Sequence, residues 1–477
     1  MKSFQRSLKA LLIYAVIALS SGNAWAELTE QEADMLQATV QSSKKGSATA
    51  LKRLQSEARN GNKNAQRVLG ELYHTGQGVP RNYSQAAQWY RKAAEQGEPR
   101  AQFFLGLLHY HGQGVTKDWE QAAQWYRQAA EQGDIYAQRN LGMLYTTGEG
   151  IPIDYDQAAS WYRKAAEQGD AVAQSALGKL YEKGQGVLQD YAQAAQWYHK
   201  AAEQGNAAGQ SGLGRLYFFG MGVTKDHSQA AQWFRKAAAQ GDAGGQAGMG
   251  MLHWTGWGAP RNYAQAAAWY RKAAIQGNAD AQTQLGLMYI YGKGVPQNYA
   301  YAAQWYRKAA EQGDAIAQSW LGSLYDEGKG VSKNYRQAAQ WYLAAAKQGN
   351  TVSQARLGEL YYLGQGVPQD YMQAALWLRK AADHYVLASE DVLVNLGILY
   401  HYGQGVPQNK VVAYALFNLA TTLDYSNNNN ASHLRSNLSK NMSSQEIEAG
   451  QELTRQLELP GNLLHALDQY LLTTQKK

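Results

Sequence analysis

The side chains in this sequence that could perform chemistry fall into a few short motifs, each with a simpler structural interpretation. Gly-x-Gly triplets recur, but none extends into the G-x-G-x-x-G or Gly-Lys-Ser/Thr patterns that hold phosphates. His109 and His111 are too close for metal ligands on one helix face, which need the i and i+4 positions. The carboxylates Asp326 and Glu327 fall at an expected helix end, where water solvates them. The absence of cysteine excludes thiol catalysis. We therefore predict neither an enzyme nor a bound cofactor or metal.

Any functional side chain must be positioned by the repeated elements of the chain, and these are marked by a tryptophan that recurs every 36 residues. A fixed period of this length is typical of a solenoid, in which each unit buries its apolar face against its neighbours. Function then depends on the long surface of the stacked helices rather than on one catalytic pocket. The series runs Trp89, Trp125, Trp161, Trp197, Trp233, Trp269, Trp305, Trp341 and Trp377.

Each repeat contains the start and stop signals of two helices. In residues 62–97, Asn62 is expected to cap a first helix that ends at Gly76, and Asn82 to cap a second that ends at Gly97. Asn82 and the glutamine three residues later form a predicted capping box. Apolar residues recur at helical spacing between these signals, so each helix presents one buried face.

Small and large residues alternate on these buried faces. Gly70 stands in the middle of the first helix at a cost in helix propensity, which indicates a close contact between helices. Alanines on the second helix let neighbouring helices approach, so tryptophans such as Trp197 are expected to be buried between them. His109 takes the position that Tyr73 has in the preceding repeat, which predicts a histidine packed in the core.

The pattern Ala-Gln-x-x-Leu-Gly-x-Leu-Tyr-x-x-Gly-x-Gly-Val, followed by Asx-Tyr-x-Gln-Ala-Ala-x-Trp-Tyr-Arg-Lys-Ala-Ala-Glu-Gln-Gly, resembles the Sel1-like repeat, a relative of the tetratricopeptide repeat. The resemblance covers residues 62–420 as ten helix pairs and implies an all-α fold, an α-solenoid superhelix. Residues 27–61 are expected to form an N-terminal segment ending in a capping helix. Residues 421–477 are expected to form a linker and C-terminal capping helices, with a capping box of Ser443 and Glu446.

The N-terminus has the pattern of an export signal. Three basic residues precede an apolar run from Leu11 to Leu19, and Ala24-Trp25-Ala26 provides the small residues of a cleavage site. We expect residues 1–26 to be a signal peptide and the mature chain to begin at Glu27. An uncleaved membrane anchor is the alternative, although the apolar run is short for a bilayer.

The export signal predicts that the mature chain lies in the periplasm, outside the cell or at its surface. Removing three basic residues leaves 42 Lys and Arg (45 minus three) against 38 Asp and Glu, so the formal charge falls from +7 to +4. That small excess gives little reason to expect nucleic-acid binding, which needs clustered basic residues. No later stretch has the apolar length of a membrane span. We expect a monomer.

The resemblance to Sel1-like proteins implies an exported protein–protein interaction scaffold. Long enterobacterial members include host-directed factors that bind immune proteins such as secretory immunoglobulin A, which makes a virulence-associated host partner one expectation. The alternative is a periplasmic adaptor for envelope assembly or signalling. A second alternative is a cell-wall-directed enzyme or ligand-binder, because cysteine-rich relatives have been linked to penicillin binding. A disulfide stabilises each repeat of those relatives, and this chain has no cysteine to form one.

Positions that vary between repeats are the candidates for partner recognition. Three slots at the end of the first helix and in its loop carry mostly large apolar side chains in the fifth, sixth and seventh repeats, where other repeats have polar ones such as Glu182. Such patches often bind proteins. The alternative is that they fill space left by the glycines of residues 241–250. The candidates are Phe218, Phe219, Met221, Trp254, Trp257, Ile290 and Tyr291.

Overall fold

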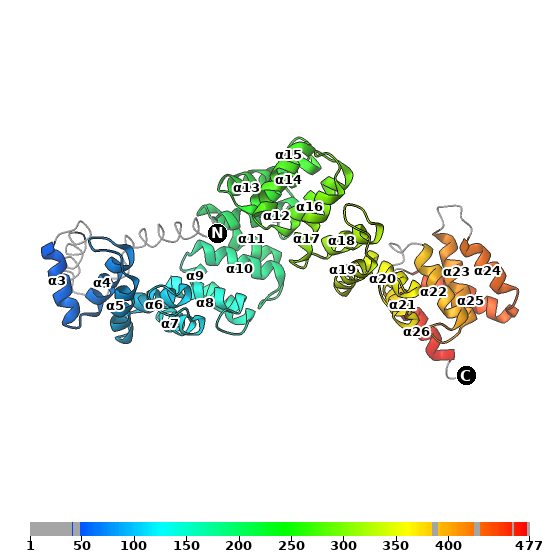
Figure 1. The fold of residues 1–477 in the computed structure, drawn as a ribbon, viewed down its shortest axis with the longest axis horizontal. Coiled ribbons are helices and arrows are strands. Elements are labelled where there is room, and N and C mark those ends of the chain that lie inside the picture. The colour runs from blue at the N-terminus through cyan, green and yellow to red at the C-terminus, as the bar shows by residue number, and fades with distance from the viewer. Residues whose placement is uncertain (1–40, 42–47, 384–389, 424–429, 460–461, 475–477) are drawn as a thin grey trace. The chain divides into compact units, whose positions relative to one another are not determined.

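In the computed structural model the described residues are 41, 48–383, 390–423, 430–459 and 462–474, and every regular element among them is an α-helix (Figure 1). The predicted all-α solenoid is thereby confirmed. The predicted signal peptide lies outside the described residues. None of the helices in the described ranges has the length and apolarity needed to cross a bilayer.

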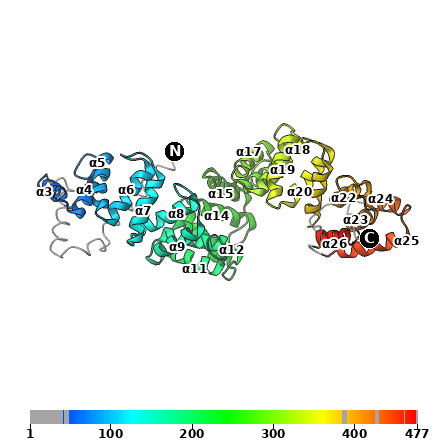
Figure 2. The ribbon, with the colours of Figure 1, turned by 90° about the horizontal axis from the view of Figure 1, so that it is seen from below.

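Short antiparallel helices follow one another along each part of the stack (Figures 1 and 2). In chain order they are α3 (Ala48–Arg59), α4 (Lys63–Thr75), α5 (Tyr83–Glu95), α6 (Pro99–His111), α7 (Trp119–Glu131), α8 (Ile135–Thr147), α9 (Tyr155–Glu167), α10 (Ala171–Lys183), α11 (Tyr191–Glu203), α12 (Ala207–Phe219), α13 (His227–Ala239), α14 (Ala243–Thr255), α15 (Tyr263–Ile275), α16 (Ala279–Tyr291), α17 (Tyr299–Ala310), α18 (Ala315–Glu327), α19 (Tyr335–Lys347), α20 (Thr351–Leu363), α21 (Tyr371–Ala382), α22 (Glu390–Tyr402), α23 (Lys410–Thr422), α24 (Asn430–Ser439), α25 (Ser444–Leu457) and α26 (Leu463–Thr474).

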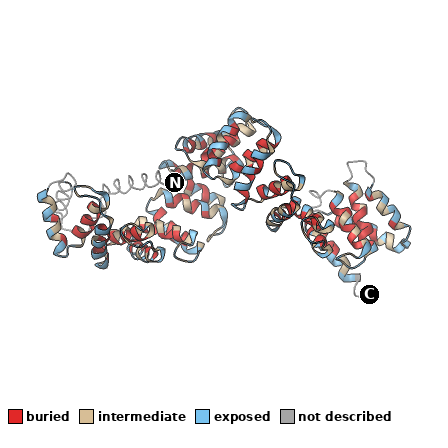
Figure 3. Cartoon of the chain, in the orientation of Figure 1, coloured by how far each residue is buried: buried red, intermediate tan, exposed pale blue. Residues whose placement is uncertain are grey.

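The chain divides into two compact units within α12 and the loop that follows it. The first unit holds the described residues up to Leu216 together with Met221–Thr224. The second holds Tyr217–Gly220 and the described residues from Lys225 onward. Within each unit the buried residues lie where successive helices face one another, and the outer faces are exposed (Figure 3). Burial therefore comes from neighbouring helices rather than from one large core.

The helix boundaries confirm the capping signals of the repeat. The Asn62 side chain accepts the Ala65 N–H at 3.0 Å, and Gly76 closes the helix in the left-handed region with φ 79°. Asn82 caps α5 in the same way by accepting the Gln85 N–H at 3.0 Å, but the Gln85 side chain does not return a bond to the Asn82 backbone, so the predicted capping box is only half formed. The full reciprocal capping box forms at Ser443, whose side chain and backbone both bond with residue 446.

Two features hold the helices of each repeat together, and only the first of them was predicted from the sequence. A Cβ on Gly70 would lie 2.6 Å from the Tyr90 ring, so glycine is needed where the paired helix comes closest. The second feature is a buried glutamine, which the sequence analysis did not identify. Gln66 donates to the carbonyl of Ala58 at 3.0 Å and accepts from Gln96 at 2.7 Å, so one side chain joins three successive helices. This arrangement recurs along both units, as with Gln138.

The recurring tryptophans are less buried than predicted. Trp161 and Trp377 are buried, and the other seven of the series are partly exposed. One face of Trp197 packs on the core of α9 and α10, while the Lys200 ammonium lies 4.2 Å from its ring centroid. A lysine three residues after the tryptophan covers the ring in seven repeats. Trp197 was predicted to be buried between helices, but it is only partly buried, because one side of its ring faces Lys200 rather than the core.

Extra helices pack on the first and the last described repeats. Helix α3 packs on α4 in the position that the second helix of a preceding repeat would take, and Leu54 is fully buried in this contact. At the other end α25 packs on α23, and α26 turns back to pack on α25 and α21. Leu453 and Leu467 join the last core cluster through these contacts. The lid interpretation of the C-terminal helices is confirmed.

Candidate protein-binding surface

The loop of each repeat is held against the repeat before it, which fixes where the variable side chains point. A Cβ on Gly258 would lie 2.3 Å from the backbone oxygen of His227, the first residue of the preceding second helix. This approach requires glycine, both for its space and for its φ of 74°. The neighbouring residue, Trp257, is thereby placed over the His227 ring.

Four aromatic rings meet at this point of the second unit. The His227 and Trp257 rings stack with centroids 5.0 Å apart, and Phe218 contacts both, at 5.0 Å and 5.8 Å. Phe219 lies edge-on to Phe218 at 5.0 Å. The Lys225 ammonium sits 5.2 Å from the Trp257 ring centroid. We call Phe218, Phe219, His227 and Trp257 the aromatic cluster.

The aromatic cluster combines a buried base with an exposed rim. Phe218 is only 2% exposed and anchors the cluster in the core of α13 and α14. Phe219 is 51% exposed and Trp257 is 49% exposed. Two large aromatic side chains held in place by their neighbours and open to solvent are the kind of anchor that dominates protein interfaces.

The other predicted candidates have different surroundings. Ile290 is 7% exposed and belongs to the core around α16. Trp254 is partly buried against Tyr263, with centroids 5.0 Å apart. Tyr291 is exposed and stands edge-on to Trp320 at 6.3 Å. Met221 belongs to the first unit.

The glycines of this region are explained by a different set of rings. A Cβ on Gly248 would lie 2.2 Å from the Phe234 ring, and one on Gly212 would lie 2.7 Å from the Tyr198 ring. The second-helix rings therefore occupy the space that the glycines leave. Trp254 and Trp257 are not needed to fill it. His227 could not be predicted from the sequence as part of this site, because a lone histidine at the start of a helix gives no signal until its neighbours are known.

Polar residues at the same slots are bound to their surroundings. The Glu182 carboxylate accepts the Tyr198 hydroxyl at 2.8 Å and pairs with Arg215. Burial and this carboxylate raise the pKa of Tyr198. In the first repeat, burial lowers the pKa of His74 to about 4. These contacts lie within the scaffold, so the slots are not uniformly open to a partner.

The motifs with possible chemistry fit structural roles. His109 is buried on α6, and burial lowers its pKa, which confirms the prediction of a packed core histidine. Across the described parts of the chain, no cluster of three or more His, Cys, Asp or Glu residues is placed to hold a metal ion.

Comparison with known proteins identifies the repeat. The Sel1 repeat family model matches residues 63–98, 99–134, 135–170, 171–206, 207–242, 243–278, 279–314, 315–350, 351–385 and 391–425. No curated protein matches the chain.

Several solved structures are similar. A protective antigen of uropathogenic Escherichia coli with an SLR fold is 34% identical, with 88% of this chain and 96% of that chain covered and a TM-score of 0.46. A Sel1 repeat protein from Oxalobacter formigenes is 34% identical over 68% of this chain and 93% of its own, with a TM-score of 0.45. Because the family model covers most of the sequence, this chain belongs to the Sel1 repeat family.

Proposed function

We propose that the protein binds a partner protein through the aromatic cluster of its second unit. Sel1 repeats indicate a protein–protein interaction scaffold, and the cluster is where this scaffold exposes rigid aromatic side chains. The observation that carries the proposal is the exposure of Phe219 and Trp257 on a base fixed by Phe218 and His227. Few side chains then need to be ordered on binding, which favours affinity.

The test is an alanine substitution on the exposed rim. Trp257→Ala should weaken partner binding by about 2 kcal/mol or more, because central aromatic anchors dominate interface energy. It should leave the melting temperature nearly unchanged, since half of the ring already faces solvent. Titration calorimetry and a thermal melt measure the two quantities.

A matched control separates binding from folding. Lys183→Ala changes an exposed side chain at the slot equivalent to Phe219 in the fourth repeat and should alter neither quantity. Glu182→Ala is unsuitable, because Glu182 bonds Tyr198 and Arg215. If Trp257→Ala lowers the melting temperature while affinity holds, the cluster is core packing and the proposal fails.

We also propose that the partner is met outside the cytoplasm, as the sequence of residues 1–26 predicts. N-terminal sequencing of protein from the native cell should then begin at Glu27, and an intact Met1 on cytoplasmic protein would contradict export. A host protein such as secretory immunoglobulin A and a bacterial envelope protein are the two candidate partners. Capture from host secretions and from periplasm, each compared between the parent and Trp257→Ala, distinguishes them.

A further inference from the structure

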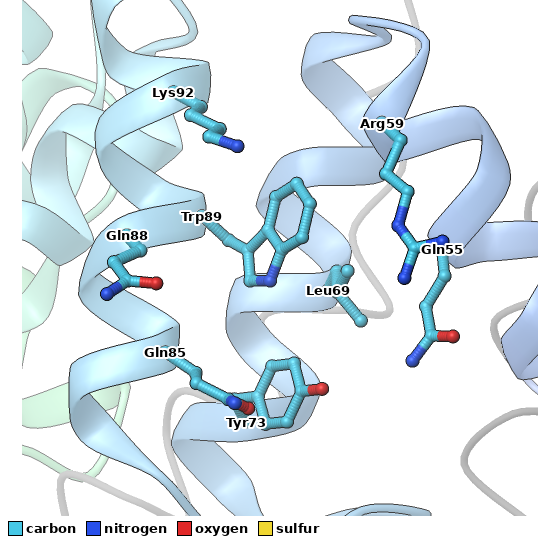
Figure 4. Close-up of a pocket in the computed structure, with 8 residues that line it drawn as sticks. All are labelled: Gln55, Arg59, Leu69, Tyr73, Gln85, Gln88, Trp89 and Lys92. Atoms are coloured by element: carbon cyan, nitrogen blue, oxygen red, sulfur yellow. The ribbon is translucent and has the colours of Figure 1, made fainter.

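An open cavity of about 230 Å³ lies in the first unit between α3 and α5, over α4 (Figure 4). We call it the first groove. Trp89 and Tyr73 project into it, with Leu69 behind the indole ring. Arg59 and Lys92 stand on either side of that ring, each on a different helix. Three glutamine side chains complete the lining: Gln55, Gln85 and Gln88.

The first groove lacks a bridge that crosses the corresponding groove in five later repeats. There, an arginine on the preceding second helix donates to a tyrosine hydroxyl on the next first helix. Gln55 occupies the arginine position. The Tyr73 hydroxyl, unlike the Tyr73 carbonyl, has no hydrogen-bond partner among the described residues, so it is free to bind a ligand. The bridges are Arg127–Tyr145 at 3.0 Å, Arg163–Tyr181 at 2.9 Å, Arg271–Tyr289 at 2.9 Å, Arg307–Tyr325 at 2.6 Å and Arg379–Tyr400 at 3.0 Å.

The charge of the first groove is also reversed relative to most repeats. Arg59 occupies a position that is glutamate in five repeats, at Glu95, Glu131, Glu167, Glu203 and Glu311. Arg59 has no ion-pair partner among the described residues, and the Lys92 ammonium lies 4.6 Å from the Trp89 ring centroid. The lining holds two exposed cations and no carboxylate. Its complement is a ligand that carries negative charge beside an apolar group.

The last groove of the stack shows that this surface can take a helix. Helix α26 packs on α21, where Arg379 stands at the position of Gln55. The Asp468 carboxylate of α26 pairs with Arg379, and the Leu464 N–H donates to Asp383 at 3.2 Å. Leu467 is buried in the same contact. An amphipathic helix with one carboxylate on the arginine thus packs on the α21 side of the groove at the C-terminal end.

We infer that the first groove is a second docking site, which takes an acidic amphipathic segment of a partner protein. A carboxylate of the segment lies between Arg59 and Lys92, and an apolar side chain packs on Trp89. In the last groove, Asp383 accepts the backbone N–H of Leu464 at the start of α26. Arg59 occupies the equivalent position in the first groove. The first groove therefore favours a carboxylate where the last groove favours a helix N-terminus. The site is independent of the aromatic cluster, which belongs to the other unit.

Fluorescence anisotropy on the full-length protein tests this inference with two labelled peptides. One is built of Leu and Glu at helical spacing, and its counterpart has Gln in place of Glu. The acidic peptide should bind saturably, and the Gln peptide about tenfold more weakly, because the charge pairs are lost. Arg59→Glu places a carboxylate where five later repeats have one and should weaken the acidic peptide by about tenfold or more.

A charge control removes the effect of overall charge. Arg336→Glu makes the same charge change as Arg59→Glu, at an exposed position on α19 in the second unit. It should leave the acidic peptide's affinity unchanged, and Trp257→Ala should do the same. Equal binding of the two peptides, equal weakening by Arg336→Glu, or no saturable binding would each overturn the inference. Circular dichroism of Arg59→Glu shows that the helices remain formed.

Discussion

The Asp134 carboxylate ties the stability of the first unit to pH. It caps α8 by accepting the Ala137 N–H at 2.8 Å, and burial raises its pKa to about 6 from an ordinary value of 3.8. Below about pH 4 the group is neutral in the folded and unfolded states. As pH rises through 6, the folded state must bury a charge, so the stabilisation present in acid is lost.

Asp134→Asn should remove this dependence, because Asn206 and Asn350 make the same cap in other repeats. We expect the variant to gain on the order of 1–3 kcal/mol over the parent between pH 4 and pH 7. Urea unfolding of both proteins at the two pH values measures the difference, and other titrating groups cancel in the comparison. If the free energies of unfolding of the parent and the variant change equally between the two pH values, the pKa of Asp134 is not raised.

The packing of α13 against α14 depends on a glycine at the contact. A Cβ on Gly248 would lie 2.2 Å from the Phe234 ring. Gly248→Ala should therefore destabilise the second unit by about 1–3 kcal/mol, because the ring has to move within a packed core. Helix propensity alone predicts the opposite, a gain of up to about 1 kcal/mol. A chemical denaturation curve decides between the two signs.

The element scale also shows what could be predicted from the sequence and what could not. Caps such as Asn62 and glycines such as Gly76 act on neighbours in the chain, so their sequence signals suffice to place the helices. The contact between Gln66 and Gln96 joins residues 30 apart, and a glutamine gives no sign of burial in one sequence. Phe218 and Phe219 are adjacent and chemically alike, yet one is core and the other exposed. Their difference depends on how the loop of the next repeat folds back.

On the scale of the molecule, each unit is a chain of interfaces between neighbours, so damage at one repeat should remain local. Trp197 illustrates this, since its ring packs on α9 and α10 and Lys200 covers its other face. Trp197→Ala should cost about 1–3 kcal/mol, below the 3–5 kcal/mol of a fully buried tryptophan. Lys200→Ala, which removes only the cation, should cost about 0.5–1 kcal/mol.

Hydrogen exchange resolves where the loss falls. Protection in Trp197→Ala should drop in α9, α10 and α11, which share the packed ring, and should stay close to that of the parent in α3, α4 and α5. The distant helices keep all their own contacts, and a solenoid has no shared core through which the loss would spread. An equal drop in protection from α3 to α11 would mean that the first unit opens as a single cooperative block, and the interfaces between repeats would then be far stronger than the repeats themselves.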